Sequence, residues 1–241
     1  MKMITKILPL KVEGLEYSIN GLPLLGPINL EFRPGTKTLI IGPNGAGKSL
    51  LLRLCHGLLA PSKGTISWQG VESRSFRQHQ SFVFQHPIML NRTAAENVEY
   101  PLKIRGIKSS DRHEQVYAAL QSTGLTNLAN RSAQQLSGGE KQKLALARSW
   151  VIKPEVLFLD EPTASLDPKS TQDVEQLINA IHKSGTKIIM TSHDFSQVRR
   201  LADEICFIHK GKVIEHASAN EILDRPKEPT TQAYLNGDLL I

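Results

Sequence analysis

The sequence predicts an α/β fold with a mainly parallel sheet, and three observations support this prediction. Short apolar runs with the length of strands buried on both faces occur at residues 38–41, 156–159 and 187–192. Each run is followed by glycine or by polar residues, and stretches with helical periodicity lie between the runs. Residues 10–40 alternate apolar and polar positions around two turns that contain glycine, which indicates an additional antiparallel lobe.

Length and composition favour one ordinary globular domain with a sub-lobe. The 241 residues are 40% hydrophobic and 22% charged, and no apolar run approaches the ~18 residues needed to cross a bilayer. Residues 1–10 lack a sustained apolar core and a cleavage site, so we expect the chain to stay in the cytosol. Cys55 and Cys206 are expected to be buried, reduced thiols. The net charge of +6 comes from dispersed basic residues, which indicates solvated faces rather than a nucleic-acid site.

The loop after the first buried run is a candidate phosphate-binding loop. Its sequence GPNGAGKS has two glycines that bracket four residues, followed by Lys and Ser. Gly42, Gly45 and Gly47 allow positive φ and a close approach of backbone N–H groups to phosphate oxygens. Lys48 supplies a cation for the β- and γ-phosphates, and Ser49 supplies a hydroxyl for Mg²⁺. The strand before this loop and the helical sequence after it predict a nucleotide site rather than an ordinary glycine turn.

Two further side chains in this half of the chain can reach a ligand. Residues 64–70 and 81–84 have strand-like sequences next to turns. Gln85 follows the second of them, where polar groups of an α/β sheet reach ligands, although it also fits an exposed loop. Tyr17 in the N-terminal lobe fits either stacking on an adenine ring or packing in the core of the lobe.

The sequence pattern changes at residues 86–149, and this segment predicts a helical insertion. Residues 112–124 have helical periodicity, and no strand-like run intervenes. The insertion ends in the sequence LSGGE at residues 136–140, followed by helical sequence at 141–151. This second glycine-rich loop opens a helix, so it can bind phosphate, or Ser137 can simply cap the helix.

Polar side chains follow the second and third buried runs. Asp160 and Glu161 come directly after residues 156–159, and alternation along a strand directs them to different places. Asp160 can therefore reach the Mg²⁺ shell, directly or through water, while Glu161 can polarise a water aligned with the γ-phosphate. His193 follows the third run and can hydrogen-bond a γ-phosphate oxygen.

The segments between and after these runs contain simpler signals. Residues 165–168 are expected to form a turn before a helix at 172–182. Residues 204–216 are expected to form a hairpin around Lys210-Gly211, and residues 219–223 a short helix.

Five stretches in this order resemble the ATP-binding cassette family over nearly the whole chain. GPNGAGKS resembles its Walker A loop, LSGGE its signature, VLFLDE its Walker B strand, and SLDP and SHD its D-loop and switch-histidine segments. The resemblance implies an α/β P-loop NTPase with a mainly parallel RecA-like core, an antiparallel β subdomain and a helical subdomain. It implies one domain over residues 1–241. The parts expected are the antiparallel lobe and the start of the core (1–85), the helical subdomain with the signature (86–150), and the remaining core with a short tail (151–241).

The resemblance also implies a site for ATP and Mg²⁺. Tyr17 matches the family's adenine-stacking aromatic, Gln85 its Mg²⁺-touching glutamine that relays to the partner subunit, and His193 its γ-phosphate switch. The residues expected to bind ATP are Tyr17, Gly42, Pro43, Asn44, Gly45, Ala46, Gly47, Lys48, Ser49, Leu50 and Gln85. The residues expected to bind Mg²⁺ are Ser49, Gln85 and Asp160, and those expected to carry hydrolysis are Glu161, His193 and Lys48.

Members of this family act as head-to-tail dimers, so the resemblance implies a homodimer of ATPase subunits. The Walker A loop of one subunit and the signature of the other close over the same ATP. The residues expected to hold the ATP of the partner subunit are Ser137, Gly138, Gly139 and Glu140, and Asp167 belongs to the D-loop. Hydrolysis then lets the dimer open.

Two positions depart from the family pattern. Leu50 replaces a hydroxyl residue often found after GKS, which removes a side-chain contact to the α-phosphate and leaves the backbone contact. Glu140 stands where glutamine is common, which adds a negative charge near the signature. Neither departure removes a catalytic group.

The resemblance favours the energising subunit of an importer, a peripheral protein on the cytoplasmic face of the inner membrane. Its expected partners are integral-membrane permease subunits and, indirectly, a periplasmic or extracellular solute-binding protein. Residues 96–98 and 101–106 resemble the importer lobe that receives the permease. Residues 194–204 and 237–240 resemble subunits assigned to the uptake of tungstate or a related oxyanion.

Other functions carry the same motifs. An exporter subunit that works with a separate permease is one alternative. An ATPase acting on nucleic acid is another, but such proteins have long coiled coils between Walker A and signature, and the segment here is too short. We therefore expect no nucleic-acid partner. Translation-associated ATPases join two cassettes, and a non-hydrolysing regulatory module would lack Glu161 or His193.

Overall fold

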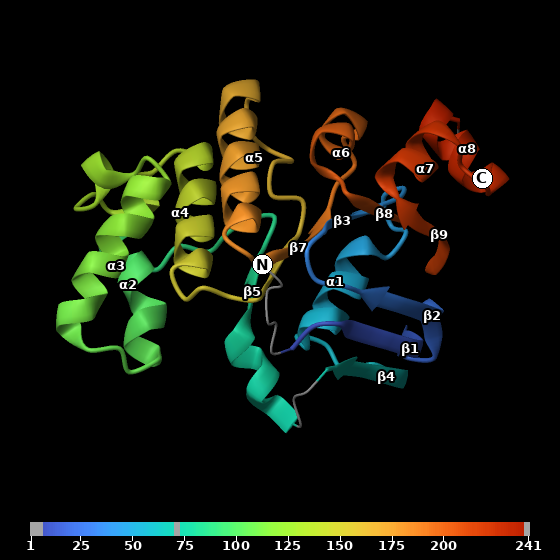
Figure 1. The fold of residues 1–241 in the computed structure, drawn as a ribbon, viewed down its shortest axis with the longest axis horizontal. Helices are drawn as coiled ribbons and strands as arrows, with labels where there is room; N and C mark the ends of the chain where they lie inside the picture. The colour runs from blue at the N-terminus through green and yellow to red at the C-terminus, as the bar shows by residue number, and fades with distance from the viewer. Residues whose placement is uncertain (1–6, 70–72, 239–241) are drawn as a thin grey trace.

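The computed structural model describes residues 7–69 and 73–238, and its central layer is a mixed sheet (Figure 1). The strands of this sheet are β3 (Lys37–Ile41), β5 (Gln80–Val83), β6 (Val156–Leu159), β7 (Lys187–Thr191), β8 (Glu204–His209) and β9 (Lys212–Ser218). Among the described residues they form six strands in the order β5-β6-β7-β3-β8-β9. The first five run parallel and β9 is antiparallel to β8, so the predicted parallel sheet and the hairpin around Lys210-Gly211 are confirmed.

A second, antiparallel sheet forms the predicted N-terminal lobe. Its strands are β1 (Leu10–Ile19), β2 (Leu22–Phe32) and β4 (Lys63–Trp68), in the order β2-β1-β4. The turn between β1 and β2 contains Asn20 and Gly21, both with positive φ. Gly70, which ends the strand expected at 64–70, and residues 239–240 lie outside the described residues.

Helices cover both faces of the central sheet, and three of them form the helical insertion. The helices are α1 (Lys48–His56), α2 (Ala94–Ile104), α3 (Ser109–Ser122), α4 (Gly138–Trp150), α5 (Pro168–Lys183), α6 (Phe195–Leu201), α7 (Ala219–Asp224) and α8 (Pro229–Asn236). Short 3₁₀ helices are η1 (Ser73–His79), η2 (Thr126–Leu128) and η3 (Ala133–Gln135). Helices α2, α3 and α4 lie together at one end of the molecule (Figure 1). The helix expected at 172–182 begins earlier, at Pro168, because Asp167 caps it.

The two faces of the sheet pack against different layers. Along each strand alternate residues face opposite sides, so Leu39 and Ile41 join one apolar cluster while Ile40 joins the other. The first cluster contains residues of α2 to α7, and the second contains residues of α1 and of the antiparallel lobe. Cys55 and Cys206 lie in the second cluster as buried free thiols, as expected. Burial raises the pKa of the Cys55 thiol to about 12 and raises that of Cys206 as well.

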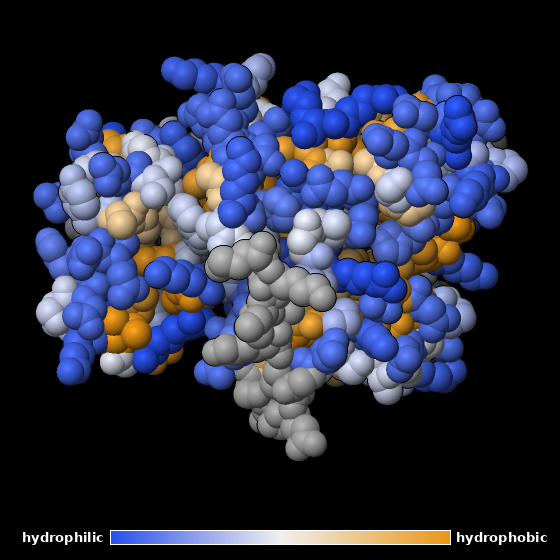
Figure 2. Space-filling view, viewed as in Figure 1, coloured by the Kyte–Doolittle hydropathy of each residue, from blue (hydrophilic) through white to orange (hydrophobic). Residues whose placement is uncertain are grey.

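One face of the molecule carries its apolar residues in separate groups (Figure 2). On the face shown in Figure 2, hydrophilic side chains predominate and the apolar ones gather in small areas between them. Within residues 7–69 and 73–238, no helix is long and apolar enough to cross a membrane.

The polar segments singled out above meet at one edge of the sheet. Because β3, β6 and β7 run parallel, their carboxyl ends lie together. The glycine loop follows β3, the two carboxylates follow β6, and His193 follows β7. In open α/β sheets ligands bind at this edge, so the fold itself brings the predicted site together.

Candidate nucleotide site

The backbone of the glycine loop has the conformation that the motif predicts. Gly42, Gly45 and Gly47 have φ values of 151°, 80° and 103°. A Cβ atom on Gly42 would lie 2.1 Å from the carbonyl oxygen of Ile208 at the neighbouring strand β8. The loop therefore has room only for glycine at its first position.

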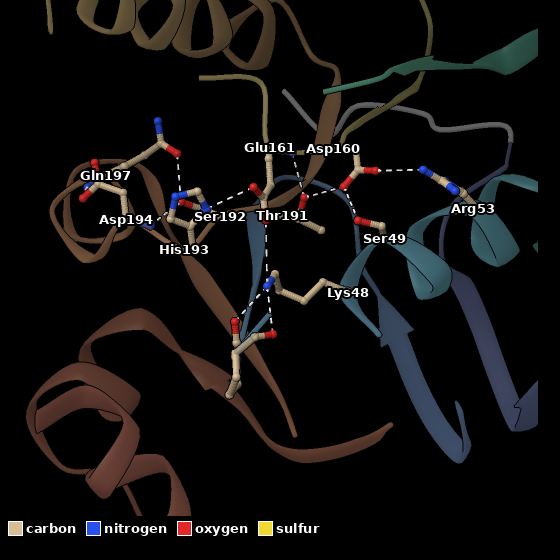
Figure 3. Close-up of polar contacts among 12 residues, drawn as sticks. Lys48, Ser49, Arg53, Asp160, Glu161, Thr191, Ser192, His193, Asp194 and Gln197 are labelled. Carbon is tan, nitrogen blue, oxygen red and sulfur yellow. Dashed lines mark hydrogen bonds and ion pairs between the residues drawn. The ribbon is translucent and has the colours of Figure 1, made fainter. Parts of the chain in front are cut away.

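Lys48 is the buried cation of this loop. Its Nζ donates hydrogen bonds to the carbonyl oxygens of Gly42 (2.8 Å) and Pro43 (3.2 Å) and lies 3.8 Å from Oε1 of Glu161 (Figure 3). Burial lowers the pKa of Lys48, while the nearby carboxylates of Glu161 and Asp160 act in the opposite direction. The ammonium group thus lies between the loop backbone and the carboxylate that follows β6.

Ser49 and Asp160 form a pair of oxygen donors. The Ser49 hydroxyl donates to Oδ1 of Asp160 at 2.7 Å, and the Thr191 hydroxyl donates to the same oxygen at 2.9 Å. Nη2 of Arg53 lies 3.7 Å from Oδ2 of Asp160. Asp160 is buried, so its carboxylate is held at a fixed place beside the first turn of α1.

The donor set of this pair fits Mg²⁺. Magnesium binds proteins through one or two side-chain oxygens and completes its shell with phosphate and water oxygens. Ser49 and Asp160 supply such oxygens next to the glycine loop. The part of the chain that the structure describes contains no cluster of three His, Cys, Asp or Glu residues for a metal.

Glu161 takes an unusual backbone conformation. Its φ is +44°, in the left-handed region that residues with a Cβ rarely adopt. Its N–H donates to Oγ1 of Thr191 at 2.8 Å, and Oε2 of its carboxylate lies 3.0 Å from Nδ1 of His193. With Lys48 on the other side, the carboxylate lies between a cation and the histidine (Figure 3). This arrangement suits a group that binds and polarises a water molecule.

A polar network connects the segments that carry Glu161 and His193. Gln197, buried on α6, accepts a hydrogen bond from the hydroxyl of Ser192 (2.9 Å) and donates to the hydroxyl of Thr163 (2.8 Å). It therefore connects the segment after Glu161 with the segment that carries His193. A cleft of about 610 Å³ opens beside these segments.

Tyr17 and Gln85 lie apart from this cluster of contacts. Tyr17 is half-buried on β1 against the second apolar cluster, and it pairs with Leu25, whose side chain faces Gly47. Gln85 is exposed and lines another cleft, of about 220 Å³, together with Gly138. Their roles toward adenine and Mg²⁺ stay predictions.

The signature segment packs against α5. Ser137 caps α4, accepting a hydrogen bond from the N–H of Glu140, and Glu140 accepts one from the N–H of Ser137 at 2.8 Å. This hydrogen bond lowers the pKa of the Glu140 carboxyl. Gly139 lies against Ser170 of α5, so close that a Cβ atom would be 2.5 Å from its hydroxyl oxygen. Within one chain, the signature is therefore a capped helix end.

Asp167 has a structural task that is visible in the single chain. Its Oδ1 accepts hydrogen bonds from the N–H groups of Lys169 and Ser170, both at 3.0 Å. Its Oδ2 accepts one from the Ser170 hydroxyl at 2.5 Å, and these bonds lower the pKa of the carboxyl. Asp167 thus caps α5.

The sequence patterns did not identify three residues that lie near the site. Arg53 on α1, Thr191 on β7 and Gln197 on α6 contact the site, and none of them lies in one of the five motifs. For Thr191 a signal existed, because it is a hydroxyl residue at the end of an apolar run. The signal was weak, since threonine is also common in strands.

This sheet, with the glycine loop and carboxylates at its edge, defines a P-loop NTPase that binds ATP with Mg²⁺ and hydrolyses the ATP. The family model described as "ABC transporter" matches residues 25–164, which is more than half of the chain. The chain belongs to the ABC transporter family.

Similar proteins cover almost the whole chain. It is similar to the tungstate uptake system ATP-binding protein TupC of Peptoclostridium acidaminophilum, 38% identical over 205 residues, 85% of this chain and 96% of that protein. It is also similar to the phosphate import ATP-binding protein PstB 2 of Natronomonas pharaonis, 34% identical over 248 residues, 96% of this chain and 87% of that protein. Among solved structures, cbiO1 from Clostridium perfringens, part of the ABC transporter complex cbiONQ, has a TM-score of 0.81 at 30% identity, with 94% of each chain covered. The predicted fold, ATPase activity and family are confirmed.

Proposed function

We propose that this chain energises the import of a solute through a separate membrane permease, and that the solute is tungstate or a related oxyanion. The observation that carries the proposal is the 38% identity with TupC over nearly the full length of that protein. The similarity to PstB 2 supports an oxyanion, because tungstate and phosphate are both tetrahedral oxyanions.

In the proposed reaction, the loop of residues 42–49 binds the phosphates of ATP. Glu161 positions and polarises the attacking water, because its carboxylate is held between Lys48 and His193. Lys48 turns from the loop carbonyls toward the phosphates and offsets the charge that develops there. His193 contacts the γ-phosphate and responds to its loss. Bound Mg²⁺ supplies further positive charge, held by Ser49 and Asp160.

We assign the remaining contacts to a dimer. In this dimer a second copy of the chain brings its Ser137, Gly138 and Gly139, which lie at the start of α4 beside α5, to the ATP held by the glycine loop. In the same dimer Tyr17 stacks on adenine, and Gln85 would supply a further oxygen to bound Mg²⁺. The D-loop residue Asp167 keeps the start of α5 in place beside the signature.

We also propose a location and binding partners for the chain. It is a peripheral subunit on the cytoplasmic face of the membrane, it binds permease subunits directly, and it depends on a solute-binding protein outside the cell. Nucleic acid is not among the proposed partners.

Affinity purification of a tagged Glu161→Gln chain from its native membranes tests this proposal. The substitution keeps ATP binding and removes the carboxylate that polarises water, so we expect it to trap the ATP-bound complex. Mass spectrometry should find an integral-membrane permease and an oxyanion-type binding protein. A permease found without any binding protein would favour an exporter. Nucleic acid or ribosomal proteins without a permease would overturn the transport function.

Metal analysis of cells tests the solute. Cells in which Glu161→Gln replaces the wild-type chain should contain less tungsten than wild-type cells grown in the same medium, while their phosphate uptake stays unchanged. Unchanged tungsten together with reduced phosphate uptake would identify phosphate as the solute. Unchanged accumulation of both would exclude the oxyanion proposal.

A further inference from the structure

We propose that Thr191, the last residue of β7, is a positioning residue that holds Asp160 and Glu161 in their two separate orientations. The inference rests on the roles proposed above for those two carboxylates. It does not depend on which solute is transported.

The strand order explains how one residue can reach both carboxylates. β7 lies between β6, which precedes Asp160, and β3, which precedes the glycine loop. Its register pairs Met190 with Leu159 on one side and Thr191 with Ile40 on the other. Thr191 therefore ends β7 at the level where the other two strands deliver their polar groups, and it is fully buried there.

The hydrogen bonds of Thr191 allow a single arrangement of its hydroxyl. The backbone N–H of Glu161 can only donate, so at 2.8 Å Oγ1 of Thr191 must accept that bond. A hydroxyl has one proton of its own, and Oδ1 of Asp160 at 2.9 Å is an acceptor for it. The hydroxyl of Thr191 thus donates to Asp160 and accepts from the N–H of Glu161, and Figure 3 marks both contacts.

The first of these bonds orients Asp160. Its Oδ1 accepts from Thr191 on β7 and from Ser49 on α1, at 2.9 and 2.7 Å. Two donors from different elements fix the rotation of the carboxylate. Without Thr191, the Ser49 hydroxyl would be the nearest remaining donor to that oxygen, and the carboxylate could turn toward Arg53.

The second bond supports the backbone of Glu161. The left-handed φ of +44° persists only where surrounding contacts hold it, and the bond from its N–H to Thr191 is such a contact. This backbone conformation directs the Glu161 carboxylate to Lys48 and His193. One hydroxyl thus separates two adjacent carboxylates, one toward Ser49 and the other toward the water site.

Thr191→Val is the direct test, because valine keeps the branched shape in a buried strand and lacks the hydroxyl. Thr191→Ser restores the hydroxyl, and Thr191→Ala is a second variant without it in case valine disturbs folding. The matched control is Thr38→Val. Thr38 is a buried threonine of the neighbouring strand β3, and at the opposite end of the sheet its hydroxyl donates to Glu204 and accepts from the Lys187 ammonium.

Turnover is measured in membranes that contain the complete transporter, with Glu161→Gln membranes as the background. We expect kcat to fall about 10- to 100-fold in Thr191→Val and Thr191→Ala, as for other residues that orient a ligand-bearing side chain. At saturating Mg²⁺ the KM for ATP should change by less than about threefold, because the glycine loop is untouched. Thr191→Ser should recover kcat to within about threefold of the wild type, and Thr38→Val should keep wild-type kcat.

Binding to the purified chain provides a readout other than activity. The affinity for ATP is measured at several Mg²⁺ concentrations by equilibrium titration, and thermal unfolding is measured without nucleotide. We expect Thr191→Val to need a higher Mg²⁺ concentration for the same ATP affinity, since Asp160 is less well oriented. Its affinity in the absence of Mg²⁺ should equal that of the wild type.

Several results would overturn the inference. Wild-type kcat in both Thr191→Val and Thr191→Ala would show that the hydroxyl has no positioning role. An equal fall of kcat in Thr191→Ser, or in Thr38→Val, would show that the fall in Thr191→Val comes from disturbed packing and not from the missing hydroxyl at the site. Normal turnover in Glu161→Gln would instead contradict the proposed role of Glu161. This outcome is read from the Glu161→Gln variant alone, so it is distinguishable from a failure of the Thr191 inference.

Discussion

Alanine at Gly139 tests the packing between the signature helix and α5. A Cβ atom on Gly139 would lie 2.5 Å from the hydroxyl oxygen of Ser170 and 2.9 Å from its Cβ, both closer than non-bonded atoms tolerate. The neighbouring Gly138 is the control, since its Cβ would lie 3.9 Å from a side-chain carbon of Leu166, an ordinary contact. The two positions carry the same substitution one residue apart.

The expected magnitudes follow from these distances. Alanine is favoured over glycine by about 1 kcal/mol in a helix interior, and at the first two positions of α4, where both glycines lie, the gain is at most this large. Overpacking at Gly139 opposes this gain with about 1–3 kcal/mol. Ser170 cannot move away freely, because its hydroxyl donates to Asp167 at the cap of α5. Gly138→Ala should therefore raise the free energy of unfolding by up to about 1 kcal/mol, and Gly139→Ala should lie about 1–3 kcal/mol below it.

Thermal unfolding without nucleotide measures this difference, because ligand binding would add its own stabilisation. For a chain of this size 1 kcal/mol corresponds to about 2–4 °C, so the two Tm values should differ by about 2–12 °C. A Ser170→Gly background removes both close atoms, and the nearest one left is the Cα of residue 170 at 4.0 Å. There the two alanine variants should have equal Tm. A Tm difference that persists in that background would refute the packing argument.

Two other substitutions give separate tests. Lys48→Ala should abolish measurable ATP binding in equilibrium titration, because it removes the buried cation of the glycine loop, and unchanged affinity would contradict the proposed phosphate site. Lys187 lies buried at the opposite end of the sheet, and burial, partly offset by Glu204, lowers its pKa to about 8. The ordinary pKa of lysine is 10.5. Between about pH 8 and pH 10.5, Lys187 therefore holds a proton in the unfolded chain that it has lost in the folded chain. The free energy of unfolding should therefore rise with pH in this window, by at most about 1.4 kcal/mol per pH unit. Denaturant titrations should show that Lys187→Met lacks this rise, and equal slopes in both proteins would show that another group is responsible.

The strands and the glycine loop could be predicted because their signals are local. An apolar run such as residues 156–159 fits a strand buried on both faces, and the structure buries all four of its residues. The spacing of Gly42, Gly45 and Gly47 directly expresses the positive φ values that the loop requires. These features depend on neighbours in the sequence alone.

Short helices near the C-terminal end were harder to predict. α6 and α8 have seven and eight residues, which is too few turns for a clear apolar period. The start of α5 had a usable signal, because Asp167 followed by Pro168 matches an N-cap and a first helical position. Taking residues 165–168 as a turn placed that start four residues too late.

The contacts around the carboxylates could not be predicted because they join different elements. Asp160 is about thirty residues from Thr191 and more than one hundred from Ser49, and the strand order brings them together. The same holds for Gln197, whose partners Thr163 and Ser192 lie on two loops. Sequence periodicity identifies strands and leaves their order in the sheet undetermined.

The two buried thiols make the chain convenient for site-directed labelling. Maleimides react with the thiolate, and burial keeps both Cys55 and Cys206 protonated and covered. The chain has no other cysteine, so one introduced at an exposed position such as Tyr117 would be the single reactive site. A spin label or fluorophore there would report the distance between the two copies of the proposed dimer, with both native cysteines left in place.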